Sequence, residues 1–204
     1  PAIAASPDDR IVAVGAADGR VLLLDAAPSS PTYNQFVAEA AVLGGVVTDL
    51  ATAPDGANVW VGATGDSRVR SVGIDPGSAV FGTVTRTIEI GAADPGRLAI
   101  TPTGDELLVA DPAAASLRVV DLITGSTDSL SLTGAVAGLN GEIRDMALHP
   151  AGTHAYLAIG DDDPVAVLAI DIAQRTVAGS ATIPGTLLTE MPIALAFPPD
   201  GDHC

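Results

Sequence analysis

The sequence predicts an all-β protein built from a repeat of about four dozen residues. Apolar residues make up 48% of the 204 residues, and they fall in short runs rich in Val, Ile and Leu. The 22 glycines and 15 prolines separate these runs, as is typical of strands joined by turns. One turn proline recurs at spacings of 47, 48, 48 and 49 residues, a period in the range of propeller blades. Its positions are Pro7, Pro54, Pro102, Pro150 and Pro199.

The first strand of each repeat is the short apolar run before this proline, as at 50–53. The second residue of every such run is alanine. In a propeller this strand lines the crowded central channel, where small side chains let the blades approach. The alanines therefore favour a propeller over a straight solenoid; they are Ala4, Ala51, Ala99, Ala147 and Ala196.

Three further strands follow each proline turn. In the turn, Pro pre-sets φ and Gly accepts a positive φ. An Asp ends each third strand and is expected to open an Asx turn; these residues are Asp25, Asp75, Asp121 and Asp171. The second strands are predicted at 11–14, 58–61, 106–110 and 154–159, the third at 21–24, 69–74, 117–120 and 165–170, and the fourth at 36–43, 83–90, 127–132 and 176–183.

These elements predict one partial β-propeller over residues 1–204, with four four-stranded blades and the first strand of a fifth. The blades span 2–48, 49–96, 97–143 and 144–192, and the fifth starts at 193–204. A closed ring of four blades is possible. Such a ring would not need a strand at 193–204 unless that strand replaces the first strand at the N-terminus. An open arc exposes strand edges. We therefore expect part of a larger, about seven-bladed propeller, with the remaining blades or another chain closing the ring.

The proline turn and the strand after it carry a family pattern. The turn at 54–56 precedes Trp60-Val61, and the turn at 150–152 precedes Tyr156-Leu157. With 102–104, these segments resemble the YVTN/lactonase-like β-propeller superfamily, close to NHL and WD40-like repeats, over residues 2–204. The sequence departs from the pattern at Asp9, where Gly is usual, and it lacks a Gly-His…Trp-Asp signature. The resemblance implies the fold, but scaffolds, adhesins and enzymes share such blades.

The charge of the chain excludes some partners. The formal net charge is -16, and all nine basic residues are Arg. An acidic surface repels phosphate, so we expect no nucleic-acid partner, and no apolar run is long enough for membrane insertion. The acidic charge is typical of a protein that stays soluble in a salty or extracellular setting, so we expect an extracellular, periplasmic or cell-surface location. The single cysteine, Cys204, cannot form an internal disulfide. Because the chain begins at Pro1 without Met, we expect a mature product or an excerpt.

Candidate binding residues lie in the loops between blades and between second and third strands. In a propeller these loops share one face, where ligands usually dock. We expect this acidic face to bind a protein, a glycan or a cation. The candidate residues are Asp18, Asp49, Asp66, Arg97, Asp111, Arg144, Asp145, Asp161, Asp162, Asp163 and Glu190.

The sequence predicts no catalytic residue, no metal site and no cofactor. Asp161–Asp163 can supply oxygens to Ca²⁺, but three adjacent Asp cannot all converge on one ion, and the spacing of a calcium loop is missing. His149, His154 and His203 lack zinc-site spacing. We find no Gly-x-Ser-x-Gly elbow and no phosphate-binding loop.

The favoured function is therefore a non-catalytic binding or scaffold propeller. A second hypothesis is a hydrolase similar to the lactonase-like members, with Arg97, Arg144, Asp145 and Glu190 at the channel mouth. A third is a structural module that a partner chain or domain completes.

Overall fold

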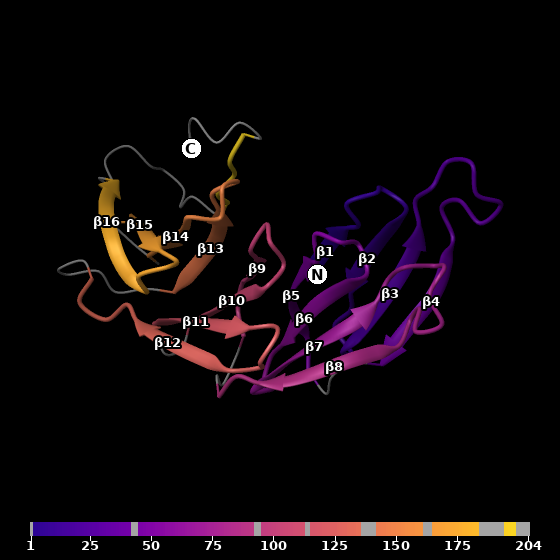
Figure 1. Cartoon of the computed structure of the whole chain (residues 1–204), viewed down its shortest axis with the longest axis horizontal. Coiled ribbons are helices and arrows are strands. Elements are labelled where there is room, and N and C mark those ends of the chain that lie inside the picture. Colours follow the sequence, from indigo (N-terminus) through magenta and orange to yellow (C-terminus); the bar gives the residue numbers. More distant parts are fainter. Residues whose placement is uncertain are drawn as a thin grey trace. The chain divides into compact units, whose positions relative to one another are not determined.

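The computed structural model describes residues 2–41, 45–91, 95–112, 115–135, 142–160, 165–183 and 194–198. The described residues form four antiparallel four-stranded sheets (Figure 1), which confirms the predicted all-β class. The chain divides into two compact units, Pro1–Ile100 and Thr101–Cys204. Within the part of the chain that the structure describes, no helix is long and apolar enough to cross a membrane.

Each sheet is formed by consecutive strands in chain order, which is the order within a propeller blade. The second, third and fourth strands of every blade begin within one residue of their predicted positions. The first blade consists of β1 (Ala2–Ala5), β2 (Ile11–Gly15), β3 (Arg20–Asp25) and β4 (Phe36–Ala41), and the second of β5 (Val47–Thr52), β6 (Asn58–Ala63), β7 (Arg68–Gly73) and β8 (Val84–Glu89). The third consists of β9 (Leu98–Ile100), β10 (Glu106–Asp111), β11 (Ser116–Asp121) and β12 (Thr127–Ser131), and the fourth of β13 (Ile143–Leu148), β14 (His154–Ile159), β15 (Val165–Asp171) and β16 (Thr176–Ile183).

The turn between the first two strands has the same backbone conformation in all four blades. Gly56, Gly104 and Gly152 have φ values of 70°, 78° and 70°. Asp9 takes the same place in the first blade with φ 57°. Asp is one of the few residues that tolerates the left-handed region. The departure of Asp9 from the family pattern therefore leaves the turn unchanged.

The predicted Asx turns form after the third strand of each blade. Each Asp carboxylate accepts a hydrogen bond from a backbone N–H two or three residues on, so the turn is fixed locally. The bonds run from Ala27 N to Asp25 (3.0 Å), from Gly77 N to Asp75 (2.9 Å), from Ile123 N to Asp121 (2.7 Å) and from Gln174 N to Asp171 (2.8 Å).

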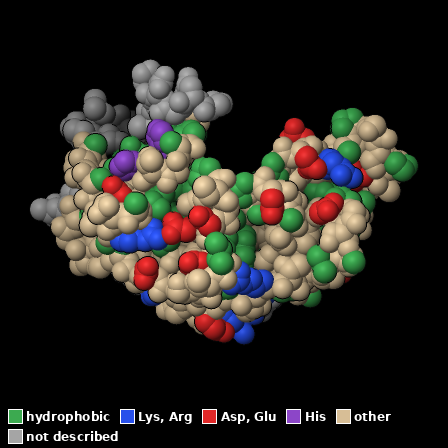
Figure 2. Space-filling view, viewed as in Figure 1, with side chains coloured by type: hydrophobic (Ala, Val, Ile, Leu, Met, Phe, Trp, Pro, Cys, Tyr) green, Lys and Arg blue, Asp and Glu red, His purple; other side chains and the backbone are tan. Residues whose placement is uncertain are grey.

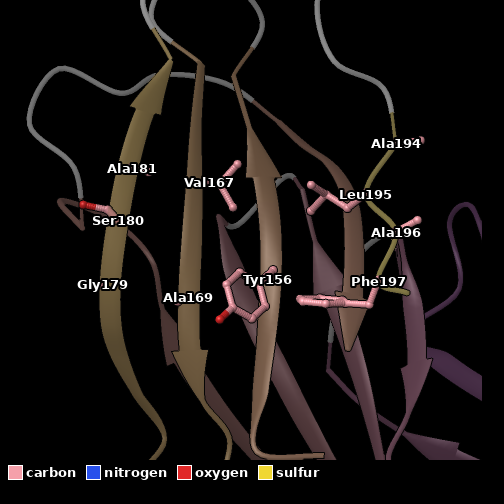
Figure 3. Close-up of a pocket in the computed structure, with 10 residues that line it drawn as sticks. All are labelled: Tyr156, Val167, Ala169, Gly179, Ser180, Ala181, Ala194, Leu195, Ala196 and Phe197. Atoms are coloured by element: carbon pink, nitrogen blue, oxygen red, sulfur yellow. The ribbon is translucent and has the colours of Figure 1, made fainter. Parts of the chain in front are cut away.

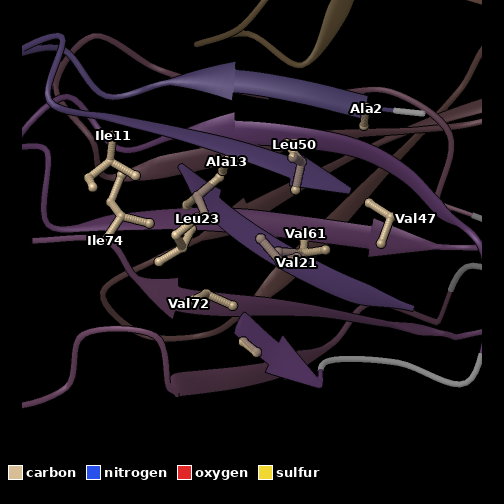
Figure 4. Close-up of a cluster of buried hydrophobic side chains, with 12 residues drawn as sticks. Ala2, Ile11, Ala13, Val21, Leu23, Val47, Leu50, Val61, Val72 and Ile74 are labelled. Atoms are coloured by element: carbon tan, nitrogen blue, oxygen red, sulfur yellow. The ribbon is translucent and has the colours of Figure 1, made fainter. Parts of the chain in front are cut away.

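The core of the first unit lies between the first and second blades (Figure 4). Val21 and Leu23 on β3 are fully buried in one cluster with Val59 and Val61 on β6. Their alternation along the strands puts these side chains on the facing surfaces of the two sheets. Ala4 packs against the same cluster, so the repeated alanine contributes to the contact between blades.

Neighbouring blades approach closely at their turns, and the contact repeats. A Cβ added to Gly56 would lie 3.7 Å from Cδ of Pro7, in the turn of the preceding blade. In the second unit, a Cβ on Gly152 would lie 2.9 Å from Cδ of Pro102. The turn glycine of one blade thus lies over the turn proline of the blade before it, in each unit.

Residues 194–198 lie beside β13, where the first strand of a fifth blade is expected. Leu195 N–H donates to Oδ2 of Asp145 at 2.5 Å. The Phe197 ring lies 5.5 Å from the ring of His149 and 5.0 Å from that of Tyr156, both edge-on. No strand is formed by 194–198, the described part of this segment. In a blade the first strand pairs with the second strand of the same blade, and the described residues include no such second strand for 194–198.

Candidate functional site

The loop edge is the edge at which the first and third strands of each blade begin. In the first unit it is formed by loops 16–19 and 64–67 and by segments 45–46 and 95–97, which lead into β5 and β9. Four of the predicted binding residues, Asp18, Asp49, Asp66 and Arg97, fall on this edge of the first unit, and their contacts show which of them are exposed.

A mixed-charge cluster occupies the loop edge of the first blade. Arg20 Nη2 lies 2.8 Å from Oδ2 of Asp18, and its Nη1 lies 3.0 Å from Oε2 of Glu39 on β4. The three side chains are 44%, 54% and 61% exposed. The hydrogen bond from Arg20 lowers the pKa of Asp18. Asp18 is therefore an ionised carboxylate paired with Arg20 of its own blade. The cluster presents both signs of charge to solvent.

The second blade repeats the Asp and the Arg of this cluster at the same positions, and its Glu lies directly opposite the Arg, whereas Glu39 lies opposite Leu22. Arg68 Nε lies 2.8 Å from Oδ1 of Asp66 and 3.8 Å from Oε1 of Glu89 on β8. Here the Asp is buried, and Arg70 Nη1 also donates to its Oδ2 at 2.6 Å. Burial raises the pKa of Asp66, but the hydrogen bond from Arg68 and the positive charges of Arg70 and Arg68 outweigh it, so the pKa is lowered overall.

Two other predicted binding residues connect successive blades. Asp49 Oδ2 accepts a hydrogen bond from Leu98 N–H at 2.8 Å, and Asp145 Oδ2 accepts one from Leu195 N–H. Each carboxylate thus binds the first strand or segment of the following blade. Both side chains have a structural contact that sequence reasoning did not anticipate.

The remaining predicted binding residues differ in their contacts and burial, and four of them lie outside the described residues. Arg144 Nε donates to the carbonyl of Gly160 at 3.3 Å, and its Nη1 lies 3.5 Å from Glu142. Asp111 is 1% exposed at the end of β10, and Arg97 is half-buried. Asp161, Asp162, Asp163 and Glu190 lie outside the described residues, so the run of three Asp and the Glu of the hydrolase hypothesis stay predictions.

The clustered arginines and glutamates were missed by sequence reasoning. Figure 2 shows arginine side chains next to acidic ones in both units. The available signal is an Asp-x-Arg triplet that recurs at 18–20 and 66–68, with a Glu on the fourth strand of the same blade. Within the described ranges, no group of three or more His, Cys, Asp and Glu side chains could hold a metal ion.

The opposite edge of each blade, where the first and third strands end, carries carboxylates that accept hydrogen bonds from hydroxyl groups and backbone N–H groups. Ser30 and Thr32 donate to Asp25 and lower its pKa. Thr103 and Thr101 do the same for Asp105. Backbone N–H groups of Thr124 and Ile123 lower the pKa of Asp121. These charges stabilise turns inside single blades.

The lowered pKa values predict acid-sensitive stability. Because the folded pKa of Asp25 lies below its unfolded value of 3.8, its contribution to stability is complete above that value and is lost as pH falls through the folded pKa. We expect a nearly constant free energy of unfolding between about pH 5 and pH 7 and a progressive decrease below about pH 4. Urea unfolding at a series of pH values from about 7 to below about 4 measures this free energy of unfolding. Asp25→Asn should reduce the acid dependence, and an unchanged profile in that variant would contradict the assignment.

An apolar groove of about 600 Å³ lies between the fourth blade and 194–198 (Figure 3). Tyr156 on β14 and Val167 and Ala169 on β15 form one wall, and Leu195 and Phe197 form the other. The groove contains no charged side chain among its lining residues, so it is a packing surface for apolar groups.

Solved structures similar to this chain are propellers. Hydrazine synthase of Kuenenia stuttgartiensis matches 90% of this chain at 21% identity and a TM-score of 0.74. The Cps50 (Swd1) β-propeller domain of Myceliophteria thermophila matches 98% at 14% identity and a TM-score of 0.73. No family model and no curated protein matches the sequence.

These similarities show the fold alone. They confirm the predicted β-propeller, whereas the YVTN/lactonase-like resemblance stays a prediction. The chain spans 49% of the hydrazine synthase chain and 59% of the Swd1 domain structure, so its number of blades is consistent with part of a larger propeller.

Proposed function

We propose that this chain is part of a non-catalytic scaffold propeller that binds a protein partner at its loop edge. The observation that carries the proposal is the repeated cluster of Asp, Arg and Glu in the first two blades. Two adjacent blades each expose an Arg and a Glu beside one another, Arg20 with Glu39 and Arg68 with Glu89, which suits a partner with its own alternating charges.

The chemistry of the clusters favours a protein over a cation or a glycan. The Asp carboxylates are already paired with Arg20 and Arg68, so neither is a free ligand for a cation. Arg is enriched in protein interfaces and forms bidentate bonds with carboxylates. The strongly acidic composition is the reason to propose an extracellular, periplasmic or cell-surface location.

The proposal is tested with peptides selected on the intact chain from a displayed random library. We expect the selected peptides to bind the double variant Arg20→Gln/Arg68→Gln at least about tenfold more weakly, because two interface arginines are lost. Fluorescence polarisation with one labelled peptide measures the affinity.

The matched control is Arg10→Gln, an exposed arginine in the turn at the opposite edge of the first blade. It should leave the affinity unchanged. Equal binding by wild type and the double variant would reject the loop edge as the site, and so would an equal loss in the control. Turnover of lactone substrates by the purified chain would reject the non-catalytic assignment.

A further inference from the structure

The two charge clusters at the loop edge differ in how much of their arginine is already bound. In the first blade, Nε and Nη2 of Arg20 both lie 2.8 Å from Oδ2 of Asp18, and Nη1 lies 3.0 Å from Oε2 of Glu39. All three guanidinium nitrogens thus have a carboxylate oxygen beside them. A further carboxylate that bonds to two of these nitrogens must compete with one that is already there.

The corresponding arginine of the second blade is bound through one nitrogen. Nε of Arg68 lies 2.8 Å from Oδ1 of Asp66 and 3.8 Å from Oε1 of Glu89. Among the described residues, neither Nη1 nor Nη2 of Arg68 donates a hydrogen bond. These two nitrogens form the end of the guanidinium fork, whose spacing matches the two oxygens of a carboxylate. The Arg68 side chain is 42% exposed, which leaves room for a partner to approach it.

A second arginine, Arg70, accounts for this difference. Its Nη1 lies 2.6 Å from Oδ2 of Asp66, so the two oxygens of this carboxylate bind two different arginines. Asp66 and Arg70 are 10% and 13% exposed, and their burial fixes the direction of the carboxylate. Arg68 is therefore held by Oδ1 alone, and its Nη groups point away from the pair.

The first blade lacks this second arginine. Leu22 lies opposite the fourth residue of β2, at the place where Arg70 lies opposite the fourth residue of β6. Asp18 is therefore bound by Arg20 alone, which approaches it with both Nε and Nη2. We call Arg70 a positioning residue, because its bond to the shared carboxylate keeps the fork of its neighbour free.

We infer that Arg68 is the anchor of the loop edge and that it binds a side-chain carboxylate of the protein partner end-on, through Nη1 and Nη2. This inference rests on the proposed function and names the group that the partner presents at that site. Arg68 is ordered by its bond to a buried carboxylate before the partner arrives, so little conformational entropy is lost on binding. A two-point bond between charged groups is also among the stronger hydrogen-bonded contacts.

The local charge favours Arg68 over Arg20 as well. In the first blade two carboxylates, Asp18 and Glu39, surround one arginine, so an incoming carboxylate is repelled. In the second blade two arginines balance the two carboxylates. Because the whole chain has a formal net charge of -16, a uniformly acidic partner is disfavoured, and we expect the carboxylate in a segment that also carries basic residues.

Peptides selected on the intact chain test the inference, because they can be changed without altering the fold. Each Asp and Glu of the labelled peptide is replaced in turn by Asn or Gln, and the C-terminus is amidated so that only side chains supply carboxylates. We expect one replacement to weaken binding to wild type at least about tenfold, as for a charged pair at a hot spot. The same replacement should leave binding to Arg68→Gln unchanged. Fluorescence polarisation measures each affinity.

Single variants of the two arginines give the matched comparison. Arg68→Gln should weaken peptide binding at least about tenfold, because the anchor is lost. Arg20→Gln should weaken it less than about twofold, since this arginine is exposed and already paired within its blade. Arg68→Lys keeps the positive charge but has no fork, so it should bind nearly as weakly as Arg68→Gln.

The role of Arg70 is tested by its coupling to Arg68. Arg70→Leu installs the residue of the first blade and lets Arg68 approach Asp66 with two nitrogens, so it should weaken peptide binding several-fold. Adding Arg70→Leu to Arg68→Gln should cause no further loss. A purely structural role would weaken binding equally in both backgrounds and would overturn the positioning role.

The outcomes separate this inference from the proposed function. Equal binding by wild type and the double variant Arg20→Gln/Arg68→Gln would reject both. A weak double variant in which Arg20→Gln causes as much of the loss as Arg68→Gln would overturn the inference alone, since the loop edge would still be the site. The same holds if no Asn or Gln replacement in the peptide changes the affinity, or if Arg68→Lys binds as well as wild type.

Discussion

Replacing Leu23 by alanine is expected to lower the free energy of unfolding by about 3 kcal/mol. Leu23 is fully buried in the cluster between the first two blades. Its truncation removes apolar contacts and leaves a cavity, because the strands on both sides are held by their own ladders. Urea unfolding of dilute protein measures the change.

Leu22→Ala is the matched control for this experiment. Leu22 is the adjacent residue of β3 and points to the opposite face of the sheet, where it is half-buried. Its truncation should cost less than about 1 kcal/mol, because solvent already reaches the site. Equal losses in the two variants would show that the blades do not share the core described above.

The second large effect is expected at Asp66. Asp66→Asn should lower the free energy of unfolding by about 2 kcal/mol, because the largely buried guanidinium of Arg70 loses its negatively charged partner. The side chains of Asp66 and Arg70 are only 10% and 13% exposed, so water cannot replace the lost carboxylate well. Urea unfolding at neutral pH measures the loss.

Two variants test the explanation. Asp18→Asn changes the corresponding but exposed carboxylate of the first blade and should have little effect. Adding Arg70→Leu to Asp66→Asn installs the residue that the first blade has at this place, Leu22, and should recover part of the lost stability. If the double variant is no more stable than Asp66→Asn alone, the pair is not the cause.

The sequence predicted the blades because their signals are local. The spaced prolines and the Asp residues at strand ends act through bonds to neighbours two or three residues away, such as Asp25 to Ala27. The predicted places of these turns and strands were accordingly confirmed in the four described blades, whereas 194–198 form no strand.

The roles of the loop-edge residues were not predictable in the same way. The Asp18–Arg20 pair is local and was overlooked, whereas Glu39 reaches the same arginine only through the pairing of β3 with β4. Asp49 finds its partner 49 residues away, in the next blade. Such contacts depend on strand register and on the spacing between blades, which the residue pattern does not state. The sequence reasoning therefore located the charged edge without recognising its internal pairing.

The bond from Asp49 to the next blade has a consequence for how the repeat can vary. A carboxylate that accepts a hydrogen bond from a backbone N–H does not contact the side chain of the donor residue through that bond. Leu98 and Leu195 can be exchanged for residues of other shapes without loss of the donor, with proline excluded because it has no N–H. Successive blades are thus free to diverge in composition while their order along the chain is preserved.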